Sequence, residues 1–169
     1  SAAYDHSYPH CWRCKNPVIF RATDQWFMSM ETNDLRARAL REIDRTRWIP
    51  TWGRDRITGM IANRPDWCLS RQRAWGVPVI ALRCKNCGRS GTDATLARHV
   101  AAVFEKEGAD AWFTRPVEDL VPREYACPGC QARSFERETD ILDVWFDSGV
   151  SYASVIESAY GADTIADLY

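Results

Sequence analysis

The sequence predicts a mixed α+β fold in which helices and core strands flank a small, zinc-ribbon-like inserted domain. Its seven cysteines form three Cys-x-x-Cys pairs and one single residue, and two such pairs can complete the Cys₄ shell that zinc prefers. Apolar residues recur at helical spacing in three segments, with β-branched and aromatic runs between them. The chain has 169 residues, 46% of them hydrophobic and 27% charged, which suffices for one core.

The N-terminal part combines a cysteine pair with strand material. Cys11 and Cys14 form a knuckle without a matching pair, so they make an unmatched half-site for a metal. The runs 17–23 and 25–28 are rich in β-branched and aromatic residues and predict strands. The odd number of cysteine pairs indicates a piece of a larger protein.

Two helices are predicted next. The first is capped by Asn33 or Asp34, shows apolar residues at helical spacing, and ends before Pro50. The second covers 52–62 and stops at the Asn-Arg-Pro sequence of 63–65.

A buried strand is predicted at 77–82, and Pro78 favours an edge position for it because proline cannot donate to a ladder. Cys68 lies between Trp67 and Leu69, which predicts a buried, unreactive thiol.

The inserted domain is predicted between the two remaining knuckles, Cys84/Cys87 and Cys127/Cys130, each of which carries a glycine suited to a tight turn. The segment between them is too long for a simple ribbon turn. We expect it to hold too little apolar material to be stable alone, so that zinc contributes folding free energy.

Within the insertion, one helix is predicted at about 93–106, capped by Thr92 or Asp93 and closed by Gly108. Residues 110–125 are predicted to be short extended pieces, because two prolines interrupt them.

Charge is unevenly distributed although the net charge is only −1. The stretch 36–73 is rich in arginine and tryptophan, and 138–167 is acidic. The first stretch indicates either a local surface for a phosphate-rich partner or solvated faces and ion pairs. Without a membrane-length apolar run or a signal peptide, we expect a cytoplasmic location with reduced thiols, where metal ligation is favoured over disulfides.

Catalytic motifs are scarce. The sequence has no glycine-rich phosphate loop, no His-Glu-x-x-His and no nucleophile elbow. Asp140, Asp143 and Asp147 could be paired carboxylates, but without an adjacent base we favour polar positions on a half-buried segment.

Four motifs resemble isoleucyl-tRNA synthetase, a class I enzyme, and they occur in that family's order over nearly the whole chain. They are Tyr8-Pro9-His10-Cys11-Trp12-Arg13-Cys14, Phe20-Arg21-Ala22-Thr23-Asp24-Gln25-Trp26-Phe27, Asp66-Trp67-Cys68-Leu69-Ser70-Arg71-Gln72-Arg73-Ala74-Trp75-Gly76-Val77-Pro78 and Asp143-Val144-Trp145-Phe146-Asp147-Ser148-Gly149. The isoleucine enzymes match better than the valine enzymes, which usually carry an apolar residue at position 73 and Thr before Trp145.

The resemblance implies an internal segment of such an enzyme. The family's His-x-Gly-His and Lys-Met-Ser-Lys-Ser signatures are absent from this sequence. The segment would connect the editing domain to the adenylate-binding motif, and we expect it to be inactive alone. It would comprise a post-editing segment at 1–82, a zinc-binding connective insertion at 83–137, and a return to the catalytic core at 138–169.

The resemblance also implies residue roles. Zinc would bind Cys84, Cys87, Cys127 and Cys130, and Cys11 and Cys14 would be half of another zinc site. Trp145 would line the isoleucine pocket. Arg71 and Arg73 would approach the tRNA acceptor end or form structural ion pairs.

In the intact enzyme the partners would be isoleucine, ATP and tRNA, and the segment would brace the editing domain. The isolated segment could self-associate through exposed core surface. The alternative is an independent zinc-ribbon module that binds RNA or protein.

Overall fold

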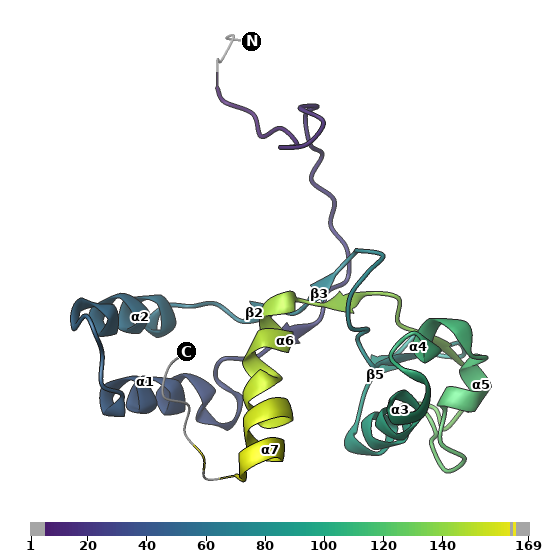
Figure 1. Cartoon of the computed structure of the whole chain (residues 1–169). Coiled ribbons are helices and arrows are strands. Elements are labelled where there is room, and N and C mark those ends of the chain that lie inside the picture. Colours follow the sequence, from purple (N-terminus) through teal and green to yellow (C-terminus); the bar gives the residue numbers. More distant parts are fainter. Residues whose placement is uncertain (1–5, 163, 165–169) are drawn as a thin grey trace.

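The computed structural model describes residues 6–162 and 164, as helices and short antiparallel sheets on either side of a central junction (Figure 1). The helices are α1 (Leu35–Arg45), α2 (Trp52–Ala62), α3 (Ala94–Glu107), α4 (Ala111–Thr114), α5 (Val117–Leu120), α6 (Val144–Ser151) and α7 (Ser158–Tyr160), with a 3-10 turn η1 (Thr32–Asp34) and a π-helical segment η2 (Tyr152–Glu157). The strands are β1 (Phe27–Met28), β2 (Trp67–Cys68), β3 (Ser70–Arg71), β4 (Leu82–Cys84), β5 (Ser90–Gly91), β6 (Phe135–Arg137) and β7 (Ile141–Leu142). The mixed α+β class is confirmed.

The segment 83–137, predicted as an inserted domain, contains the main hydrophobic core. Its antiparallel sheet has the order β5-β4-β6, and α3, α4 and α5 pack around it (Figure 1). Leu96, Val100, Trp112 and Leu120 are fully buried in this core. The insertion therefore buries several apolar side chains around its sheet, and its instability without zinc stays a prediction.

The helix predicted at 93–106 is confirmed as α3. The Asp93 carboxylate accepts a hydrogen bond from the Leu96 N–H at 2.9 Å, which satisfies a free donor of the first turn. Gly108 ends the helix with φ +82°, a conformation that glycine adopts without a steric penalty.

The prediction of short extended pieces at 110–125 is wrong. This segment instead contains the helices α4 and α5. Pro116 does not break a helix, because it lies at the start of α5, where its missing N–H has no intrahelical partner to lose. Trp112 on α4 is buried and donates its Nε1–H to the Glu138 carbonyl at 2.8 Å. Burial of this indole favours the helical turn over an extended chain.

The helices α1 and α2 form a hairpin on the opposite side of the junction (Figure 1). Both predicted helices are confirmed, with α2 spanning the expected 52–62. An ion pair between Arg54 and Asp44, 2.6 Å apart, joins them. Their burial is slight, since Ile43 is the one buried residue of α1 and α2 has none.

One strand prediction is wrong and a second is only partly correct. No strand covers 17–23, where Ile19 and Phe20 are 88% and 81% exposed, because no described segment forms a ladder with this run. In the predicted strand 77–82, Val79 is buried but regular pairing begins only at Leu82. Before that point Pro78 makes a single bridge to β7, in keeping with the missing donor of proline.

The junction joins three segments that are distant in sequence, 25–30, 66–72 and 138–146. Strands β1 and β2 pair there, and β3 pairs with β7. Ser70 is buried where the segments meet. Its Oγ accepts a hydrogen bond from the Trp26 backbone N–H and donates one to the Gln25 side chain.

Among the described residues, no helix has both the length and the apolar character needed to cross a bilayer.

Candidate functional site

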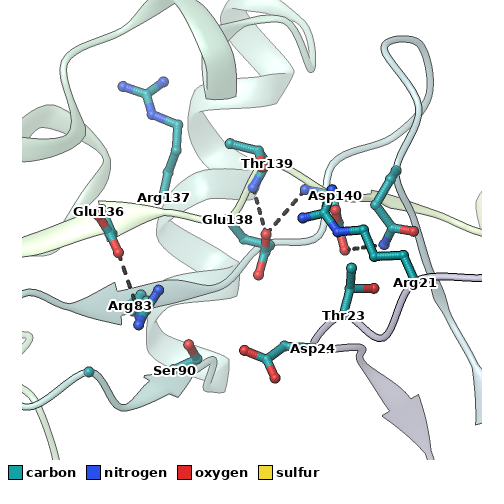
Figure 2. Close-up of a pocket in the computed structure, with 12 residues that line it drawn as sticks. Arg21, Thr23, Asp24, Arg83, Ser90, Glu136, Arg137, Glu138, Thr139 and Asp140 are labelled. Atoms are coloured by element: carbon teal, nitrogen blue, oxygen red, sulfur yellow. Dashed lines mark hydrogen bonds and ion pairs between the residues drawn. The ribbon is translucent and has the colours of Figure 1, made fainter.

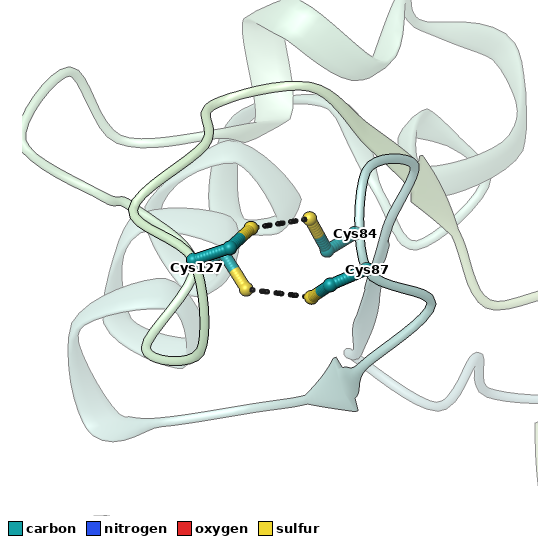
Figure 3. Close-up of side chains that lie close together, drawn as sticks. Cys84, Cys87 and Cys127 are labelled. Carbon is teal, nitrogen blue, oxygen red and sulfur yellow. Dashed lines mark hydrogen bonds between the residues drawn. The ribbon is translucent and has the colours of Figure 1, made fainter.

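Four cysteine sulfurs converge between the two knuckles of the inserted domain (Figure 3). The Sγ atoms of Cys84, Cys87, Cys127 and Cys130 all lie within 4.8 Å of one another. Two pairs, Cys84–Cys130 and Cys87–Cys127, are 3.5 Å apart. A tetrahedral zinc ion with Zn–S bonds of about 2.3 Å requires sulfur spacings of about 3.8 Å, so the cluster fits such an ion.

The first knuckle follows from a backbone turn at the end of β4. The Cys84 N–H donates to the Arg89 carbonyl at 2.9 Å, and the Gly88 N–H returns to the Cys84 carbonyl at 2.9 Å. Gly88 has φ +72°, so the predicted need for glycine here is confirmed. The turn directs both sulfurs of the pair to one side.

The second knuckle repeats this geometry. The Cys127 N–H donates to the Ala132 carbonyl at 2.9 Å, and the Gln131 N–H returns to the Cys127 carbonyl at 2.8 Å. Here Gln131, not the predicted glycine, has the left-handed φ of +61°. Gly129 instead brings its N–H to within 3.4 Å of the Cys127 sulfur.

The pKa values of two thiols of the second knuckle are shifted in opposite directions. The pKa of Cys127 is lowered to about 6, first because the Gly129 N–H donates to its sulfur. The pKa of Cys130 is raised to about 12: the Ala132 N–H lowers it, but the Cys84 thiol and burial raise it more. Crowded thiols thus resist joint ionisation, whereas a divalent cation would stabilise four thiolates together.

A third knuckle at Cys11 has the same backbone design. The Cys11 N–H donates to the Asn16 carbonyl, the Lys15 N–H returns to the Cys11 carbonyl, both at 2.8 Å, and Lys15 has φ +63°. The pKa of Cys11 is lowered, mainly by the Cys14 backbone N–H. Among the described residues, Cys11 and Cys14 join no third metal-ligating side chain, and their role as half of a metal site stays a prediction.

The remaining predicted site residues lie near the junction. Trp145 is in the first turn of α6 with 71% of its surface exposed. It borders a cavity of about 540 Å³, whose lining is Arg64, Pro65, Asp66, Trp67, Cys68, Arg71, Asp143 and Trp145. Arg71 forms an ion pair with Asp143 at 2.7 Å, which is one of its two predicted roles, and Arg73 is exposed. Cys68 is half-buried rather than buried.

Of the three aspartates, Asp143 differs from the prediction. Asp140 lies on the half-buried segment as predicted and accepts a hydrogen bond from Gln72 at 2.8 Å. Burial, and then the charge of Asp143, raise the pKa of Asp147. Asp143 is 7% exposed and accepts from Trp67 Nε1 at 3.0 Å. Its position directly before a helix, as a capping aspartate, is the sequence signal that was missed.

A second, polar cavity was not predicted. It measures about 520 Å³ and lies between the chain near Thr23 and the stretch 136–140 (Figure 2). Glu138 beside it accepts hydrogen bonds from Trp26 Nε1 and from the Thr139 N–H. Burial raises the pKa of Glu138, but these bonds outweigh it and the net pKa is lowered.

Comparison with known proteins gives the class. The model of the family described as "tRNA synthetases class I (I, L, M and V)" matches residues 10–168. This chain therefore belongs to the class I tRNA synthetase family.

The individual relatives carry one name. The isoleucine–tRNA ligase of Geobacter sulfurreducens is 57% identical over 165 residues, which cover 98% of this chain and 18% of that protein. The isoleucine–tRNA ligases of Syntrophotalea carbinolica and Desulfovibrio desulfuricans are 56% and 58% identical over 97% of this chain, and each is likewise covered to 18% of its length. The chain thus spans about a fifth of these relatives.

Proposed function

We propose that this chain functions as part of an isoleucine–tRNA ligase, which activates isoleucine with ATP and transfers it to tRNA in the cytoplasm. The supporting observation is 57% identity to such a ligase over 98% of the chain, together with the class I family match. Because the sequence lacks the family's nucleotide-binding signatures, the isolated chain should perform neither step.

Within that enzyme, Cys84, Cys87, Cys127 and Cys130 bind one zinc ion. The proposal is supported by the sulfur spacing and by the two matching knuckles. When bound, zinc would have a structural role, since four thiolates leave no open coordination position for a catalysed reaction. It clips together the two ends of the connective insertion at 83–137, between a post-editing segment at 1–82 and the return to the core at 138–169.

Trp145 forms a wall of the isoleucine pocket. Its place beside a cavity at the start of α6 supports this role. An indole wall can contact the aliphatic side chain of either isoleucine or valine. The two differ by only one methylene group, so the pocket gains little binding free energy by which to distinguish them. That difference has an established value of about 1–3 kcal/mol, which is why this class of enzyme also hydrolyses mischarged tRNA at an editing site.

The N-terminal segment braces the editing domain. The Cys11/Cys14 knuckle is preformed for a second cysteine pair, with which it would share a zinc ion. Ile19, Phe20 and Trp75, which is 92% exposed, provide apolar surface for such docking or for self-association of the isolated chain. The exposed Arg73 contacts the tRNA.

Isoleucine-dependent exchange of pyrophosphate into ATP tests the proposal. The full-length protein containing this segment should catalyse the exchange, and the 169-residue chain should not. Failure of the full-length protein with isoleucine would refute the function. Salt-dependent binding of tRNA by the isolated chain would instead favour an independent RNA-binding zinc module.

A further inference from the structure

The carboxylate of Asp143 connects three elements of the junction. Its Oδ2 accepts hydrogen bonds from Trp67 Nε1 at 3.0 Å and from Arg71 Nη2 at 2.7 Å. Its Oδ1 accepts the backbone N–H of Trp145 at 3.3 Å, in the capping position of α6. A single buried group therefore links β2, β3 and the first turn of α6.

Arg71 directs its guanidinium inward to the same group. Its Nη1 donates to the Cys68 carbonyl at 2.9 Å and to the Ser70 carbonyl at 2.8 Å, while Nη2 donates to Asp143. Three of the five N–H donors of the guanidinium are therefore engaged within the chain. The buried carboxylate of Asp143 needs this cation, because an uncompensated buried charge is strongly unfavourable.

The Trp67 indole is fixed by the same cluster. Its ring centroid lies 6.3 Å from that of Phe146 on α6, and the Arg64 guanidinium lies 5.9 Å from its centroid. By contrast, the Trp145 side chain is 71% exposed, so packing within the described chain contributes little to its placement. The direction of Trp145 depends on how the first turn of α6 is anchored.

We propose that Asp143 and Arg71 are positioning residues for the amino-acid pocket, which hold Trp145 and Trp67 at the edge of the 540 Å³ cavity. This inference rests on the proposed ligase function. Arg71 then acts on isoleucine selection through Asp143 and makes no contact with tRNA. The pair sets pocket shape rather than chemistry, so its loss should weaken amino-acid binding and leave ATP binding unchanged.

The test uses the full-length ligase that contains this segment. Asp143→Asn keeps the size and the helix-capping ability of the side chain but removes its charge. We expect the KM for isoleucine in pyrophosphate exchange to rise about tenfold, the KM for ATP to stay constant, and the preference for isoleucine over valine to fall. Asp140→Asn is the matched control, because Asp140 makes a polar contact on the same segment and should leave all three quantities unchanged.

A second pair of variants changes Arg71, the partner of Asp143, whose side chain is 40% exposed. Arg71→Gln should raise the isoleucine KM as Asp143→Asn does, and Arg71→Lys should restore part of it. An unchanged isoleucine KM in Asp143→Asn, or an Arg71→Gln effect confined to the KM for tRNA, would overturn the inference while the ligase function stands. Absence of isoleucine-dependent exchange in the unmodified enzyme would refute the ligase function itself.

Discussion

Replacing one sulfur in each knuckle, as in the Cys84→Ser, Cys127→Ser variant, should abolish zinc binding and unfold the inserted domain. The proposed metal would join Cys84 to Cys130, which are 46 residues apart. In the cross-link model, closing a loop of this length restricts the unfolded chain by about 4 kcal/mol. A domain the size of 83–137 has a total free energy of unfolding of only about 3–8 kcal/mol. Loss of the metal therefore removes a stabilisation comparable with the whole.

Two measurements check this prediction. Metal analysis should fall from one zinc per chain to none, and hydrogen exchange should show loss of amide protection in α3, whose Leu96 and Val100 are fully buried. The control is the Cys11→Ser, Cys14→Ser variant, which should keep both zinc and α3 protection. If the Cys84/Cys127 variant retained its zinc and a protected α3, the reasoning would be refuted and the metal would belong to Cys11 and Cys14.

Three further predictions concern stability. In Gly76→Ala the added Cβ would lie 2.5 Å from Cδ1 of Ile141, so thermal unfolding should show a loss of about 1–3 kcal/mol, and unchanged stability would contradict this close contact. Glu138→Gln should lower the free energy of unfolding at neutral pH, because the pKa of Glu138 in the folded state is lowered from 4.5. This loss of stability should disappear as the pH falls through that lowered pKa. Urea unfolding at several pH values measures it, and a loss that did not change with pH would contradict the reasoning. Leu96→Ala should destabilise the core by about 2–5 kcal/mol, whereas the same change at the half-exposed Met60 should have little effect, so similar losses would contradict the placement of the core.

Local patterns in the sequence predicted the three longest helices, α1, α2 and α3, and the cysteine pairs that could bind a metal. A capping aspartate, apolar residues three or four apart and a closing glycine act within a few residues of one another, so α3 was predictable almost to its ends. The Cys-x-x-Cys turns are equally local, since two backbone hydrogen bonds shape each knuckle. The prediction that two knuckles meet was supported by the preference of zinc for four ligands.

Only the tertiary structure decided features that depend on distant partners. The run 17–23 has strand-forming residues but pairs with no described strand, and residues around Trp112 became helical because burial of the indole outweighs local preference. Asp143 is separated by more than 70 residues from Arg71 and Trp67, so no local pattern could show that its carboxylate is buried between them. The energy of a buried charge depends on the groups that surround it, and those groups are assembled only by the complete fold.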